Sequence, residues 1–94
     1  MDSDADQTEA MTVFMAWVSE PAPADLAGPW DELRVAAPDL LLISSGDTLS
    51  RVYHQLKWAL PEHSALIVAP LAQVPKLKGL PQGTLSWLRD RLTS

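Results

Sequence analysis

Three short segments carry apolar side chains on both faces that an extended strand presents, and this pattern limits the folds open to the chain. They are TVFMAWV at residues 12–18, LLLIS at residues 40–44 and ALIVA at residues 65–69. Aromatic and β-branched residues favour strands, and a strand that is apolar on both faces needs cover on both. The pattern predicts a sheet with helices packed against it, and it favours an internal position for the first strand.

Segments with helical features lie between and after these strands. The clearest helix is expected over residues 48–60, where apolar residues recur at helical spacing and Asp47 is the expected N-cap. A shorter helix is expected over residues 29–37, because Pro29 suits the first helical position and acidic residues follow it. A last helix is expected to begin at Thr84.

The order strand, helix, strand, helix, strand, helix predicts a small α/β sandwich. Its three-stranded sheet is expected to be mainly parallel, with right-handed crossovers placing the helices against it. The alternative is a ferredoxin-like α+β arrangement, with an additional short strand near residues 73–80. A sheet this small leaves exposed edges, so a second copy is a natural way to cover one of them.

Length and composition indicate one domain. The chain has 94 residues, of which 47% are hydrophobic and 20% charged, and these values are typical of a single globular unit. Residues 1–10 carry four acids and few apolar side chains, so we expect a disordered acidic tail there and one α/β domain over residues 11–94. No apolar run approaches the roughly 20 residues of a membrane span, and the acidic start is unlike a secretory signal. We therefore expect a cytoplasmic protein with no membrane contact.

The residue types present argue against several chemistries. With no cysteine, the chain has no disulfide, thiolate metal ligand or cysteine nucleophile. His54 and His63 lack the spacing of a zinc site, so we expect neither a metal nor a cofactor. Ser50 lies four residues before His54, so the two side chains approach on a helix, but no third group is evident to orient them. The sequence therefore favours a non-enzymatic function.

Opposite the apolar side of the predicted 48–60 helix lies a second face. Arg51, His54 and Trp58 fall there, and Trp87 leans off the apolar side of the last helix. An exposed tryptophan beside an arginine is typical of protein–protein hot spots. The leading hypothesis is a protein-interaction module that self-associates through a face formed by these four residues. The alternative is that another element covers Trp58 as part of the core.

Charge is divided unevenly along the chain. Residues 1–47 hold ten acids and one base, a net −9, whereas residues 48–94 hold two acids and six bases, a net +4, and the total is −5. Nucleic-acid or phosphate binding by the basic half is therefore an alternative function, with the acidic tail shielding it. The six bases are Arg51, Lys57, Lys76, Lys78, Arg89 and Arg91. The chain as a whole is acidic, which ranks this function below protein interaction.

A small anionic ligand at the turn after the second strand is a further alternative. The donors expected at that turn are Ser45, Gly46 and Thr48. Hydroxyls and amides at a helix N-terminus bind anions, and ligands of parallel sheets gather at the carboxyl ends of strands. Lys76 and Lys78 follow the third strand, so a parallel sheet would bring them to the same edge.

Overall fold

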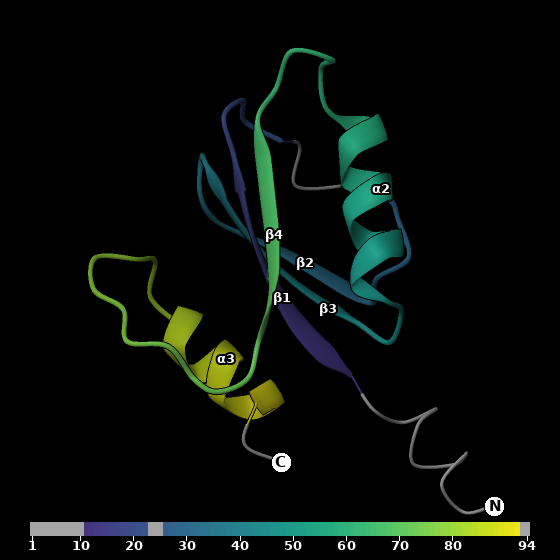
Figure 1. The fold of residues 1–94 in the computed structure, drawn as a ribbon. Helices are drawn as coiled ribbons and strands as arrows, with labels where there is room; N and C mark the ends of the chain where they lie inside the picture. Colours follow the sequence, from purple (N-terminus) through teal and green to yellow (C-terminus); the bar gives the residue numbers. More distant parts are fainter. Residues whose placement is uncertain (1–10, 23–25, 93–94) are drawn as a thin grey trace, which may run out of the picture.

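The computed structural model describes residues 11–22 and 26–92, and the expected acidic tail at residues 1–10 lies outside the described residues. The elements in the described residues are β1 (Thr12–Val18), β2 (Glu32–Ala37), β3 (Leu40–Ser45), α2 (Leu49–Ala59), β4 (Leu66–Leu71) and α3 (Thr84–Leu92). The strands form one sheet in the order β2-β3-β1-β4, and helices flank it (Figure 1).

The sheet is antiparallel throughout, so the predicted mainly parallel three-stranded sheet is wrong. β1 pairs in the antiparallel sense with both β3 and β4, and β2 pairs in the same sense with β3. β3 and β4 do run in one direction, but β1 lies between them instead of the two pairing directly. The ferredoxin-like alternative is closer because it adds a strand, yet that strand does not lie near residues 73–80.

The additional strand is β2, which occupies the segment predicted as a helix over residues 29–37. Leu33 and Val35 pack toward the α2 side of the sheet, whereas Arg34 reaches α3 on the other side. This alternation with a period of two is that of a strand. A two-residue turn at residues 38–39 returns the chain into β3, and so short a turn requires antiparallel neighbours.

The two helices are those that the sequence predicts over residues 48–60 and from Thr84 onward. Thr48, not Asp47, is the N-cap of α2, and its Oγ1 accepts a hydrogen bond from the Arg51 amide at 3.2 Å. Neither helix, in the ranges that the structure describes, has the length and apolar character needed to cross a membrane.

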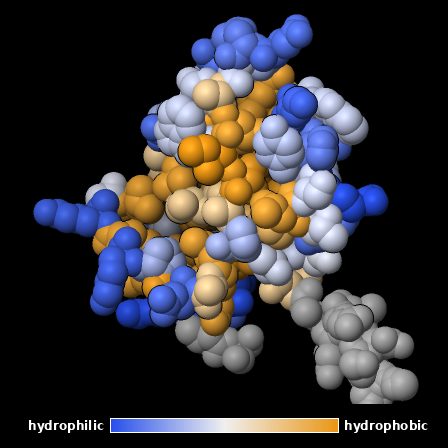
Figure 2. Space-filling model, viewed as in Figure 1, coloured by the Kyte–Doolittle hydropathy of each residue, from blue (hydrophilic) through white to orange (hydrophobic). Residues whose placement is uncertain are grey.

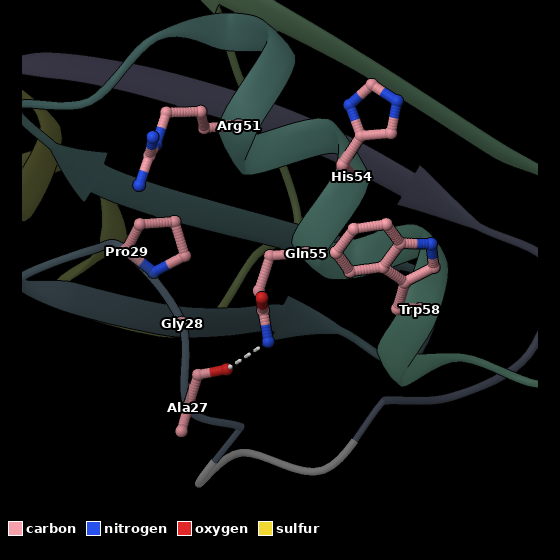
Figure 3. Close-up of a pocket in the computed structure, with 7 residues that line it drawn as sticks. All are labelled: Ala27, Gly28, Pro29, Arg51, His54, Gln55 and Trp58. Atoms are coloured by element: carbon pink, nitrogen blue, oxygen red, sulfur yellow. Dashed lines mark hydrogen bonds between the residues drawn. The ribbon is translucent and has the colours of Figure 1, made fainter.

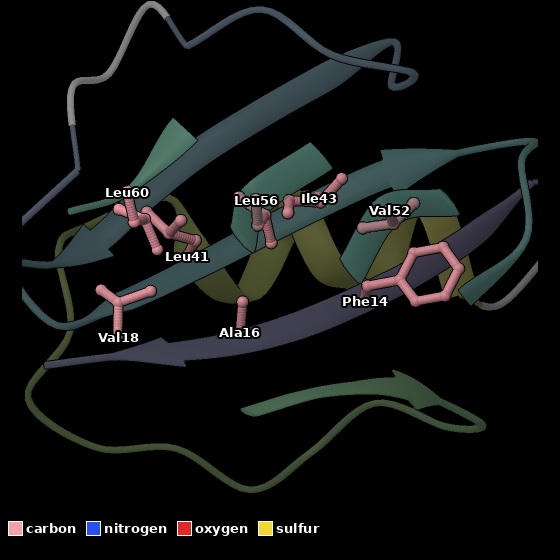
Figure 4. Packing of buried hydrophobic residues seen from close by; sticks show 8 residues of the cluster. All are labelled: Phe14, Ala16, Val18, Leu41, Ile43, Val52, Leu56 and Leu60. Carbon is pink, nitrogen blue, oxygen red and sulfur yellow. The ribbon is translucent and has the colours of Figure 1, made fainter. Parts of the chain in front are cut away.

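The face of the sheet under α2 carries the larger core cluster (Figure 4). Alternate side chains of β1 and β3 point to this face and meet one side of α2, as strand and helix periodicity require. The buried members are Phe14, Ala16, Val18, Leu41, Ile43, Val52, Leu56 and Leu60. Because this side of α2 is turned inward, its opposite side faces solvent.

The other face of the sheet is covered only in part. A second cluster packs there against α3 and the segment between β4 and α3, and its buried members are Val13, Ala36, Leu42 and Leu88. Arg91 of α3 donates from Nε to Glu32 Oε1 of β2 at 2.6 Å. Beyond this cluster Met15 and Trp17 of β1 remain 36% and 41% exposed.

Candidate protein-interaction site

An open hollow of about 690 Å³ lies between α2 and the segment that leads into β2. α2 lines it with Arg51, His54, Gln55 and Trp58, and residues 27–29 form the facing wall. Arg51 and Trp58 stand at its two ends with Gln55 between them (Figure 3). The Gln55 amide donates to the Ala27 carbonyl at 3.3 Å, and this bond ties the two walls together.

Trp58 is the most exposed large apolar side chain among the described residues, with 73% of its surface accessible. Its ring centroid lies 5.9 Å from that of His54, and the two planes are tilted by 52°. No described element covers the indole, so the alternative of a core role for Trp58 is wrong. The sequence places it opposite the apolar side of the helix, and the structure confirms that placement.

Arg51 is held in position along the helix but remains accessible. Its Nε lies 3.0 Å from Oδ1 and 3.1 Å from Oδ2 of Asp47, one turn earlier. The arginine side chain is still 71% exposed. An exposed ion pair of this kind contributes little to stability. The pair orients the Arg51 guanidinium at the rim of the hollow.

The facing wall depends on a glycine that the sequence analysis did not single out. A Cβ at Gly28 would collide with the outer ring atoms of Trp30, so only glycine fits this close approach. Trp30 Nε1 donates to the Leu26 carbonyl at 3.1 Å, and the ring packs against the core under α2. Gly28 next to Pro29 signals a turn, but nothing in the sequence places that turn against α2.

Trp87 lies on the other side of the sheet from Trp58. It is half-buried beside the second cluster, and the Arg91 guanidinium carbon is 4.2 Å from its ring centroid. α2 and α3 cover opposite faces. The structure therefore brings Arg51, His54 and Trp58 together and leaves Trp87 apart, so the four residues predicted as one interaction face do not form one surface.

The polar groups of the proposed anion site are bonded to one another. The Ser45 hydroxyl donates to the Pro29 carbonyl and accepts from the Asp47 amide, and Ser45 itself is fully buried. The Thr48 amide donates to Asp47 Oδ1 at 2.9 Å. With the side chains of the turn occupied in this way, and a carboxylate among them, the turn is poorly suited to an anion.

The lysines proposed for that site are exposed and lie in the segment between β4 and α3. Lys76 lines a separate hollow with Leu85 and Arg89, on the side of the sheet that α3 covers. Ser45, Gly46 and Thr48 instead lead into α2 on the opposite face. The two halves of the predicted anion site, Lys76 and Lys78 on one side and the turn on the other, are not assembled into one pocket.

The six bases of the C-terminal half are likewise divided between the two sides of the molecule. Arg51 and Lys57 belong to α2, and the other four belong to α3 or the segment before it. Arg51 is paired with Asp47, and Arg91 with Glu32. A continuous basic surface of the kind that follows a nucleic-acid backbone is therefore not favoured by their placement.

The Ser50–His54 pair forms as the sequence predicts, but its geometry does not favour nucleophile activation. Nδ1 of His54 lies 3.4 Å from the Ser50 hydroxyl and 2.8 Å from the Ser50 carbonyl oxygen. A carbonyl oxygen only accepts, so the shorter contact places the proton on Nδ1. In that tautomer Nδ1 has no lone pair with which to take the serine proton.

Within residues 11–22 and 26–92, no three His, Asp or Glu side chains are grouped so as to hold a metal ion. Comparison of the chain with protein-family models, with curated proteins and with solved structures finds no significant match. The side chains of the site are therefore the only guide to its function.

Proposed function

We propose that this chain is a non-enzymatic, cytoplasmic protein-interaction module, and that it docks a partner protein in the hollow between α2 and residues 27–29. The observation that carries the proposal is Trp58, a tryptophan 73% exposed on the rim of that hollow. Tryptophan and arginine are among the residues most enriched at interface hot spots, and here Arg51 stands at the other end of the same hollow.

The lining of the hollow indicates the chemistry of the partner. Trp58 and Pro29 offer apolar surface, and His54 and Gln55 offer hydrogen-bonding groups between them. The exposed guanidinium of Arg51 is accessible to a carboxylate or a carbonyl oxygen. A segment with an apolar side chain next to an acidic residue fits this arrangement.

Site-specific photo-crosslinking tests this function. A photo-reactive residue at position 58 is expected to capture a partner protein that the same residue at position 62 does not capture, because Glu62 lies outside this hollow. The purified partner is then expected to bind Trp58→Ala about 30-fold more weakly than wild type, as truncation of a hot-spot residue predicts.

The controls for this experiment are internal to the chain. Lys57→Ala removes an exposed neighbour of Trp58 that does not line the hollow, and it is expected to leave affinity unchanged. Equal affinity of wild type and Trp58→Ala for the captured protein would show that this hollow is not the docking surface.

A further inference from the structure

The two edges of the sheet differ in how they are protected from another chain. β2, at one edge, contains a bulge between Val35 and Ala37, and its charged residues are tied to α3. Bulges and charged side chains are the usual devices that keep an edge from pairing. β4, at the other edge, has no charged residue anywhere in residues 64–75.

The open edge of β4 presents unpaired backbone groups in a defined register. The amide of Ala65 donates to Ser19 Oγ and its carbonyl accepts from the Ser19 amide, so both groups at residue 65 face β1. Backbone groups alternate in direction along a strand, and β4 pairs with β1 without a shift in register. The amides and carbonyls of Leu66 and Val68 therefore point away from the sheet, and Pro70 offers only its carbonyl there.

Apolar side chains lie beside this edge on the partly covered face. Trp17 and Ile67 are direct cross-strand partners on that face, and Met15 precedes them along β1. Met15, Trp17 and Ile67, here called the open strip, are 36%, 41% and 63% exposed. Viewed toward β4, the molecular surface shows hydrophobic side chains running down the middle of the molecule along this strand (Figure 2).

We infer that the β4 edge binds a second copy of this chain, strand to strand and antiparallel, so that two sheets join into one. A twofold axis at Ile67 sets Leu66 opposite Val68 of the second copy, and both residues then use their amide and their carbonyl. A register centred one residue later would set the carbonyl of Leu66 opposite Pro70, which has no N–H to give. The register centred on Ile67 satisfies the most backbone groups.

The charge near β4 and the area buried on pairing both matter for the binding of a second copy. The chain carries a net charge of −5, so two copies repel, but residues 64–75 carry no charge and β4 itself therefore sets no like charges opposite each other. Lys57 and Glu62, which line a hollow beside Leu66, are of opposite sign. A strand of this length presents an edge about 20 Å long and one sheet thick, so pairing covers roughly 200–400 Å² per copy. Stable dimers cover about 800 Å² per copy, so this dimer is expected to be weak, with a dissociation constant between about 1 µM and 1 mM.

This surface is separate from the α2 hollow, and a pair of lysine substitutions distinguishes the two. Sedimentation of wild type across about 1 µM to 1 mM is expected to show a monomer–dimer equilibrium. Ile67→Lys sets two like charges against each other at the axis and is expected to weaken association at least tenfold. Trp58→Lys adds the same charge on α2 and is expected to leave association unchanged, with circular dichroism confirming that both variants are folded.

Cysteine cross-linking tests the register, since the natural chain contains no cysteine. Ile67→Cys is expected to form an intermolecular disulfide under mild oxidation, because the register places the two residues directly opposite each other. Met15→Cys is expected to form none, because the two β1 strands would lie three strand spacings apart, about 14 Å.

Several results would overturn the inference. One is a wild type that stays monomeric over the whole concentration range. Association that survives Ile67→Lys but not Trp58→Lys would move the contact to α2. Equal cross-linking at positions 15 and 67 would mean that the open strips stack face to face. A monomeric wild type, or equal cross-linking at the two positions, leaves the α2 hollow free to bind a different protein, so the two proposals fail separately.

Discussion

The two faces of the sheet are covered in different ways. On one face a helix of three turns buries Val52 and Leu56 completely and closes over the middle of the sheet. On the other face α3 buries Leu88 over one end of the sheet, and the rest of the cover comes from an irregular segment with two prolines. The difference suggests that one face mainly supplies stability, while the other retains apolar surface for contact with another chain.

Matched leucine truncations, one on each face, test this difference and should have the largest effects. Leu56→Ala is expected to lower the free energy of unfolding by about 3–5 kcal/mol, because the rigid helix and sheet around it leave the cavity open. Leu88→Ala is expected to cost about 2–3 kcal/mol, because the irregular segment beside it is able to collapse into the space. Urea unfolding measures both, and equal losses would mean that the two faces contribute alike.

A smaller effect is expected at the wall of the hollow. Gly28→Ala forces its Cβ against the Trp30 ring and is expected to lower the free energy of unfolding by about 1–3 kcal/mol, the usual cost of overpacking. Trp30→Phe in the same chain removes the outer ring atoms that the Cβ would meet. The double variant is therefore expected to lose less stability than the sum of the single variants. Additive losses would place the cause elsewhere.

The contrast between the faces also explains what the sequence predicts and what it leaves open. α2 is predictable because its apolar residues repeat at helical spacing, and the exposure of Trp58 follows from the same pattern. The clash at Gly28 is not predictable, because it depends on how the Trp30 ring turns back to pack against the core under α2. Local periodicity describes one element, whereas a pocket wall depends on two.

β2 shows how local signals mislead. Pro29 followed by acidic residues is a helix start by local rules, yet the structure has a strand that follows within a few residues. Its apolar residues alternate too weakly to stand out, and its charged residues find partners 48 to 59 residues away on or near α3. The Pro38–Asp39 pair between two apolar runs is the signal of the hairpin, because proline and aspartate favour turns. When residues 29–37 are predicted as a helix, the β2–β3 hairpin is missing and an antiparallel sheet is not predicted.

The prediction of parallel pairing is wrong for a related reason. A helix between two strands does make the strands run in one direction, and β3 and β4 do so. Two strands that run in one direction need not be neighbours in the sheet, however, and β1 lies between β3 and β4. The residues of the predicted anion site are apart for the same reason, since the turn after β3 and the lysines after β4 lead to opposite faces.

The smallest predicted effect concerns how α3 is held over the partly covered face. Arg34 of β2 donates from Nε to Thr84 Oγ1 at 3.3 Å and from Nη2 to the Gln82 carbonyl at 3.2 Å. These bonds are long, and one is part-buried while the other is exposed, so Arg34→Met, which keeps most of the aliphatic stem, is expected to cost only about 1 kcal/mol. Lys78→Met removes an exposed base from the same face and is expected to change stability by less than about 0.5 kcal/mol.

Hydrogen exchange locates the loss: α3 amides should exchange faster in Arg34→Met while α2 amides keep their protection. Faster exchange in both helices would mean that the two faces unfold as one unit. It would contradict the view that one face mainly supplies stability and the other mainly supplies a contact surface.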